Sequence, residues 1–111
     1  MLLLLLALGL SFAPSQFVNP GVTSHWVGTM DSQLYKIFEP ACPAEGGLRA
    51  SYRVKVKMTV DIAGQVKEVR IRGVKHPAAS AAILAALKRW EFKPTGEDRV
   101  LRFTLLVRFN C

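Results

Sequence analysis

The sequence predicts an α+β domain in which a three-stranded antiparallel sheet packs one face against a single main helix. Two observations predict this fold class. Apolar and charged residues alternate in three stretches, residues 52–60, 66–72 and 100–109, and an alanine-rich stretch from Pro77 to Trp90 has helical spacing. Such alternation is typical of strands with one side buried and the other in water. In the order of the chain, the elements are therefore β-β-α-β.

The predicted strands share the same division into an apolar side and a polar side. Three strands cannot cover their own apolar side, so the helix must lie on it. The apolar side is expected to hold Val54, Val56, Met58, Val60, Val69, Ile71, Leu101, Phe103, Leu105, Val107 and Phe109. The polar side is largely cationic and carries Arg53, Lys55, Lys57, Arg70, Arg72, Arg102 and Arg108.

The predicted helix ends in an aromatic cluster. Pro77 suits the first turn, and Trp90 and Phe92 bury large areas at the far end, where Pro94 stops the helix from continuing. We therefore interpret this cluster as a packing device. The residues expected on the core side of the helix are Ala79, Ile83, Ala86, Leu87 and Trp90.

The last predicted strand, residues 100–109, is expected at an edge of the sheet. If the chain crosses from the second to the third strand in the usual right-handed way, the third strand lies beside the first one and has a free side. This edge is long and apolar on one face, so it is either an aggregation hazard or a docking edge. An extended partner segment can add to such an edge through main-chain hydrogen bonds.

The residues that precede the domain divide into two segments. Residues 1–13 are apolar and have the length of the hydrophobic region of a signal peptide, which predicts export, although no Lys or Arg precedes this run and Pro14 would follow the cleavage site. A buried apolar arm is the alternative. Residues 14–45 are expected to be a linker with a short helix over residues 31–38, and the domain itself is expected to span residues 46–111.

The charge of the chain is concentrated in the domain. The 111 residues carry a formal net charge of +7, and residues 1–30 contain no charged side chain. A basic domain can bind nucleic acid, an acidic partner or an anionic membrane surface. Nucleic acid is not favoured, because the aromatic residues other than Tyr52 fall on buried positions, whereas sheets that read RNA interleave aromatic and basic side chains.

The two cysteines, Cys42 and Cys111, are expected to form a disulfide in an exported chain, with two unpaired thiols as the alternative. Closing a loop of about 70 residues would stabilise so small a domain by roughly 4 kcal/mol in the chain-entropy model. The two histidines, His25 and His76, have no nucleophile with an orienting acid nearby, and together with the cysteines they lack the paired spacing of a zinc site. We therefore expect no catalytic residue, no metal and no cofactor.

Three motifs follow one another in a defined order, and a family resemblance depends on them. They are Val60-Asp61-Ile62-Ala63-Gly64-Gln65-Val66, Ala86-Leu87-Lys88-Arg89-Trp90 and Phe92-Lys93-Pro94. In their order and spacing, residues 42–109 resemble the C-terminal domain of the TonB family, the periplasmic energy transducers of bacteria with an outer membrane. The structural residues of the motifs are Asp61, Gly64, Leu87, Trp90, Phe92 and Pro94. The sequence departs from the family at Tyr52, where Gly is usual, and at Cys42-Pro43, where Tyr-Pro is usual.

The resemblance implies a non-enzymatic periplasmic module linked to energy-dependent transmembrane transport. Such a module binds an extended segment of an outer-membrane receptor or another envelope protein beside its last strand. The matching edge residues are Arg102, Phe103, Thr104, Leu105, Leu106 and Val107. Arg102 and Arg108 would favour an acidic peptide.

Other features of the family limit what the resemblance implies. TonB transducers carry a full membrane helix and a long Pro-rich spacer that this sequence does not show, so a binding module is expected rather than a complete force-transmitting transducer. Membrane contact is expected only if residues 1–13 are retained as an inner-membrane anchor. The alternatives are an envelope-assembly module that forms a homodimer through its edge strand and, less favoured, a cytoplasmic nucleic-acid-binding domain.

Overall fold

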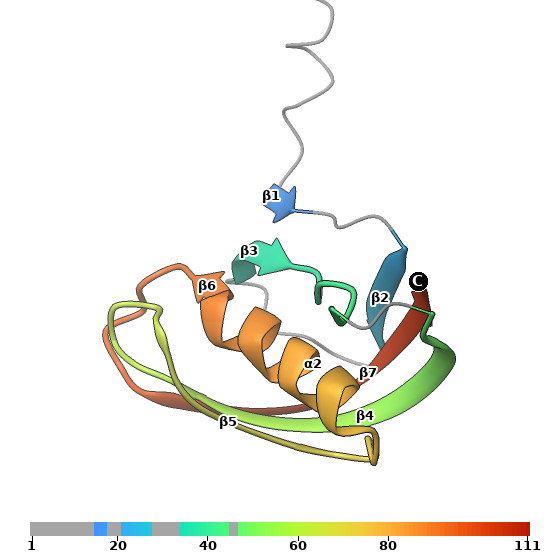
Figure 1. Ribbon diagram of the computed structural model, residues 1–111. Helices are drawn as coiled ribbons and strands as arrows, with labels where there is room; N and C mark the ends of the chain where they lie inside the picture. Colours follow the sequence, from blue (N-terminus) through green and yellow to red (C-terminus); the bar gives the residue numbers. More distant parts are fainter. Residues whose placement is uncertain (1–14, 18–20, 28–33, 45–46) are drawn as a thin grey trace, which may run out of the picture.

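The computed structural model describes residues 15–17, 21–27, 34–44 and 47–111, which form a small α+β domain with a helix against an antiparallel sheet (Figure 1). The sheet has the strand order β2-β7-β4-β5, and every neighbouring pair is antiparallel. Its elements are β2 (Val22–Val27), β4 (Arg49–Val60), β5 (Val66–Arg72) and β7 (Arg99–Asn110), and the helix is α2 (Pro77–Arg89).

A second, smaller sheet lies near the end of the helix. It contains β1 (Ser15–Phe17), β3 (Leu34–Phe38) and β6 (Glu91–Phe92) in the order β1-β3-β6. β1 runs parallel to β3, and β6 runs antiparallel to it. This sheet joins the chain ahead of the domain to the segment that follows α2.

The predicted helix and the three predicted strands form where the sequence pattern places them. β4 and β7 pair over their full lengths, from Arg49 with Asn110 to Val60 with Arg99. β5 pairs with the other side of β4. These pairings confirm the α+β class and the strand order β5-β4-β7.

The core lies between this sheet and the apolar side of α2. Ala79, Ile83 and Leu87 are at most 1% exposed, as their helical spacing predicts. The helix begins at Pro77, and His76 caps it because the Nδ1 atom of His76 accepts a hydrogen bond from the N–H of Ala79 at 3.2 Å. His76 therefore has a structural role.

Trp90 ends the helix and joins four elements. It is 2% exposed, and its Nε1–H donates a hydrogen bond to the carbonyl of Phe38 in β3 at 3.0 Å. Its ring stacks on Phe103 of β7 at a centroid distance of 5.9 Å and contacts Trp26 of β2 in an edge-on arrangement at 6.3 Å. The interpretation of Trp90 as a packing residue is thus extended to β2 and β3, two strands that the sequence pattern did not indicate.

The turn between β4 and β5 docks on β6 through Gly64. The N–H of Phe92 donates to the carbonyl of Gly64 at 2.8 Å. Gly64 has a φ of +89°, and a Cβ atom at this position would lie 1.8 Å from the carbonyl oxygen of Phe92. Glycine is therefore required here both for the backbone conformation and for the close approach of the two chains.

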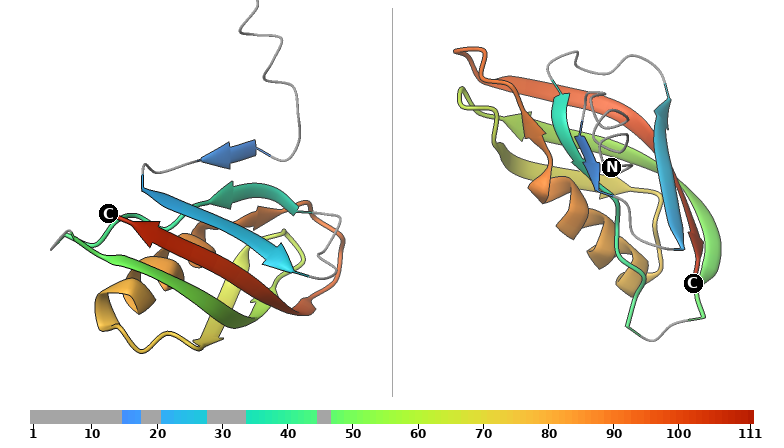
Figure 2. Two further views of the ribbon diagram at one scale, coloured as in Figure 1. Left: turned by 90° about the vertical axis from the view of Figure 1, so that its right-hand side faces the viewer. Right: turned by 90° about the horizontal axis from the view of Figure 1, so that it is seen from above.

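The prediction of a three-stranded sheet with the last strand at its edge is wrong. β2 lies beside β7 on the side opposite β4, as Figure 2 shows. The two strands pair from Val22 with Phe109 to Val27 with Thr104. β2 lies in the segment that was expected to be a linker. It carries no charged residue, so the alternation of apolar and charged residues that identified the other strands does not mark it.

The prediction of a short helix over residues 31–38 is also wrong over its described part, because Leu34–Phe38 forms β3. Leu34 and Ile37 are both buried, which is the spacing that indicated a helix. The cause is a register shift between Leu34 and Lys36, which turns both apolar side chains toward the core. Residues 31–33 and the apolar segment 1–13 lie outside the described residues.

The disulfide between Cys42 and Cys111 is confirmed, with the two Cα atoms 5.9 Å apart. It joins the segment after β3 to the residue that follows β7. The N–H of Cys111 also donates to the carbonyl of Leu48 at 2.8 Å. The end of β7 is thus held by a covalent bond and by the start of the segment that leads into β4.

The docking of the β4–β5 turn can be tested by comparing Gly64→Ala with Gly96→Ala. Gly96 has almost the same φ, +88°, but its added Cβ atom would meet nothing within 4 Å. Gly96→Ala should lower the free energy of unfolding by about 1–2 kcal/mol through backbone strain alone. Gly64→Ala should cost roughly 2 kcal/mol more, because the carbonyl of Phe92 must also move. Equal losses in urea unfolding would show that the contact with Phe92 is not needed.

Candidate functional site

The predicted docking edge, residues Arg102–Val107 of β7, is mostly occupied by β2. Thr104 pairs with Val27, and the pairing continues through Leu105 and Leu106 to Val107 with Ser24. Arg102 and Phe103 precede the first of these pairs. Phe103, Leu105 and Val107 point into the core and are buried, whereas Arg102 is exposed. The structure therefore brings the six residues together along one strand, but places a strand of the same chain beside four of them.

β2 is held against β7 by one buried side chain, one aromatic contact and one polar contact. Val22 is 1% exposed in the core, and Trp26 is half-buried against Trp90. The hydroxyl of Ser24 donates a hydrogen bond to the carboxylate of Glu39, which is 5% exposed. The other side chains of β2, including His25, point outward and are exposed. Half of this strand thus packs into the core and half faces solvent.

The opposite face of the sheet from α2 carries the cationic side chains. On this face the strand register places Lys57 beside Arg70 of β5 and beside Arg102 of β7, while Lys55 lies beside Arg72. We call the six exposed cations that gather here the basic face. They are Arg53, Lys55, Lys57, Arg70, Arg72 and Arg102.

Like charges lie directly opposite one another across the strands of the basic face, and this arrangement destabilises a sheet. Among the described residues, the single ion pair that reaches this face joins Arg70 to Glu68, with 3.6 Å between Nη2 and Oε2, and both side chains are well exposed. Arg108, the seventh predicted cation, lies farther along β7, opposite Ser51 and Thr23. Sequence reasoning found these cations, but it could not show which of them are neighbours.

Two hollows of the described part of the molecule have cationic side chains in their lining. One hollow of about 880 Å³ is lined by residues of β4, β5, β7 and α2, and none of them is an acid, a histidine or a cysteine. Another, of about 460 Å³, lies over β2, β7 and β4, with His25, Arg53 and Arg108 in its lining. Within the described ranges, no three His, Cys, Asp or Glu side chains come together as a metal-ligand set.

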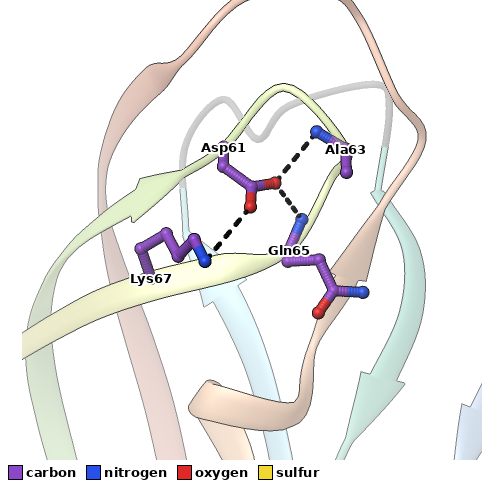
Figure 3. Close-up of polar contacts among 4 residues, drawn as sticks. All are labelled: Asp61, Ala63, Gln65 and Lys67. Carbon is purple, nitrogen blue, oxygen red and sulfur yellow. Dashed lines mark hydrogen bonds and ion pairs between the residues drawn. The ribbon is translucent and has the colours of Figure 1, made fainter.

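The motif residue Asp61 organises the β4–β5 turn (Figure 3). Its Oδ1 atom accepts hydrogen bonds from the N–H groups of Ala63 and Gln65, both at 2.9 Å, and its Oδ2 atom lies 3.5 Å from Nζ of Lys67. The hydrogen bond from Gln65 holds the pKa of Asp61 below its ordinary value, with partial desolvation opposing it and Ala63 and Lys67 assisting. Asp61 is therefore a turn-forming residue that is stabilised in its charged form.

The remaining motif residues have packing roles. Leu87, Trp90 and Phe92 are at most 3% exposed in the core, and Pro94 is exposed in the loop between β6 and β7. No helix in the described part of the chain is long and apolar enough to cross a bilayer. Comparison of the chain with protein-family models, with curated proteins and with solved structures gives no significant match.

The role of Asp61 predicts a loss of stability in acid. A carboxyl group whose pKa is lowered by folding contributes stability that is fully present above its unfolded pKa and is lost as the pH falls through its folded pKa. Thermal unfolding between pH 5 and about pH 2 should show this loss. Asp61→Asn keeps the side-chain acceptor without the charge, so its melting temperature should fall less steeply over this range. An identical slope for both proteins would contradict the role of Asp61.

The crowding of the basic face predicts that removal of its central charge stabilises the fold. Lys57→Gln removes two like-charge contacts and should raise the free energy of unfolding by about 0.5 kcal/mol at low salt. The gain should shrink in 0.5 M NaCl, where screening weakens exposed charge interactions. Lys93→Gln, in the exposed loop after β6, is the matched control and should change stability little. A loss of stability in Lys57→Gln would show that this cation supports the sheet.

Proposed function

We propose that this chain is a non-enzymatic, TonB-like module that binds an extended segment of another envelope protein by strand addition beside β7. In this proposal the partner is an acidic segment of an outer-membrane receptor or transporter, and the module works in the periplasm in support of energy-dependent transport. The partner segment takes the place of β2, residues 22–27. The proposal combines the sequence resemblance with the position of β2.

The antiparallel pairing of β2 with β7 is the observation that carries the proposal. Four of the six residues expected to receive a partner, Thr104 to Val107, already receive an extended segment that is not part of the β5-β4-β7 sheet predicted from the sequence. This segment places Val22 and Trp26 toward the core and leaves the alternate side chains in solvent. A bound peptide makes the same two kinds of contact when it adds to a sheet edge.

Three features support β2 as the strand that exchanges. β7 pairs with β4 along its whole length, and this pairing involves no residue of β2. The disulfide between Cys42 and Cys111 holds the end of β7 independently of β2. Two of the three inward residues of β2, Ser24 and Trp26, are half-buried, and only Val22 is as deeply buried as Leu105 and Val107 of β7, which are 1% exposed. Departure of β2 would therefore open the edge while the rest of the sheet stays folded.

Occupation of the edge by β2 sets the apparent affinity for a partner. When only a small fraction of a protein is in its binding-competent form, its apparent dissociation constant is the intrinsic constant divided by that fraction. Weakening the contacts of β2 should therefore strengthen partner binding. This expectation separates strand exchange at β7 from binding at β5, the other edge of the same sheet.

Trp26→Ala tests the exchange directly. The variant removes the edge-on contact with Trp90 together with part of the buried surface of β2, a loss of about 1.5 kcal/mol that should raise peptide affinity about tenfold. The measurement is an amide NMR titration of the oxidised full-length chain with a synthetic acidic segment of a candidate outer-membrane receptor. Signal changes should concentrate in residues 22–27 and 102–107.

Tyr35→Ala is the matched control for this titration, because Tyr35 is an aromatic residue of β3 that is 43% exposed. It should leave peptide affinity unchanged. Changes confined to residues 66–72 of β5, or weaker binding by Trp26→Ala, would rule out exchange at β7. Self-association of the chain that the peptide does not reverse would favour the envelope-assembly alternative.

A further inference from the structure

The basic face is an array of exposed cations, five of which also line the hollow of about 880 Å³. Its cations come from three adjacent strands, β5, β4 and β7, and all six side chains are exposed. Neighbouring strands lie about 4.8 Å apart and alternate residues along a strand about 6.8 Å apart, so the array covers roughly 10 Å by 14 Å. Such a surface can contact several anionic groups at the same time.

The fold itself gives no reason for this arrangement. Lys57 stands between Arg70 and Arg102, and Lys55 stands beside Arg72, although like charges in these positions weaken a sheet. Glu68 is the single acidic side chain on this face of the described strands. Residues that disfavour the fold at a surface are typical of a functional surface, and a ligand of this cationic surface would be anionic.

Two exposed apolar side chains lie at one end of the array. Val100 is 53% exposed and lies opposite Thr59, on the same face of the sheet as the cations. Ile62, in the β4–β5 turn at that end of the sheet, is 56% exposed. No aromatic side chain of the described strands lies on this face, so it lacks the platforms on which nucleic-acid bases stack.

We propose that the basic face docks the domain on an anionic phospholipid surface. Its cations contact headgroup phosphates, and Val100 and Ile62 reach the boundary of the acyl chains. Basic side chains combined with exposed apolar residues are typical of proteins that bind at a membrane surface. Because the array lies on the face opposite α2, docking leaves the edge beside β7 accessible from the side. The inference does not depend on the proposed peptide function.

The test is the binding of the oxidised full-length chain to lipid vesicles in 0.1 M NaCl. One set contains phosphatidylcholine with 30% phosphatidylglycerol, and the other contains phosphatidylcholine alone. The ratio of the two partition coefficients isolates the effect of charge, because both vesicles offer the same hydrocarbon to the apolar residues 1–13. Each cation near an anionic surface strengthens binding about fivefold.

Lys55→Gln, Lys57→Gln and Arg72→Gln combined should therefore lower this ratio by roughly 100-fold. The combination keeps Arg102, which belongs to the predicted docking edge, and keeps the Arg70–Glu68 ion pair. Lys75→Gln, Lys88→Gln and Lys93→Gln combined form the control, because they remove the same charge from exposed positions outside the array. The control ratio should fall no more than a few-fold. Equal falls in both variants, or no preference for anionic vesicles, would overturn the proposal.

Two soluble probes distinguish the other anionic ligands. A fluorescent single-stranded oligonucleotide and a decaglutamate peptide should each bind weakly compared with the anionic vesicles. If either one binds while the anionic vesicles show no advantage over neutral ones, and the array variant abolishes that binding, the face belongs to nucleic acid or to an acidic protein. That result would overturn the membrane assignment. Thermal unfolding of each variant checks that the domain remains folded.

Discussion

The burial of Trp90 is the interaction on which the rest of this small domain depends. One side chain closes the end of α2, stacks on Phe103 in the sheet and donates a hydrogen bond to the backbone of β3. The same ring contacts Trp26, so β2 is packed by the residue that also ends the helix. A domain of this size has a small hydrophobic core. A side chain with a large apolar body and one polar tip can join several elements of such a core at once.

Because Trp90 and β7 both contact β2, the edge and the core are not independent. The strand that covers the edge is packed by part of the aromatic cluster that stabilises the domain, yet its other half is in solvent. β2 in turn becomes an edge strand of the sheet, and its short length of 6 residues limits uncontrolled pairing there. In the proposed function, a partner segment that pairs better with β7 would displace β2.

The two candidate surfaces differ in how far the sequence defined them. The residues of the predicted docking edge do lie in one strand, as the alternation of Phe103, Leu105 and Val107 indicated. The sequence did not predict that β2 lies beside that strand. The pairing joins residues about 80 positions apart, and β2 has no charged residue to mark its exposed side. The cations of the basic face were also found in advance. The sequence did not predict which cations lie next to each other, because the pairing of residues such as Lys57 and Arg102 depends on the register of two strands.

By itself, the sequence determined the strands β4, β5 and β7, the helix and the side of each that is buried. These features depend on local periodicity and on turn residues such as Asp61 and Gly64. The number of cysteines indicated a disulfide but left two unpaired thiols open, because it does not show that Cys42 and Cys111 approach each other. The tertiary structure alone decided that residues 22–27 become the fourth strand, that Leu34–Phe38 is a bulged strand rather than a helix, and which cations face each other. Each of these outcomes depends on contacts between distant segments, and a local sequence pattern does not specify such contacts.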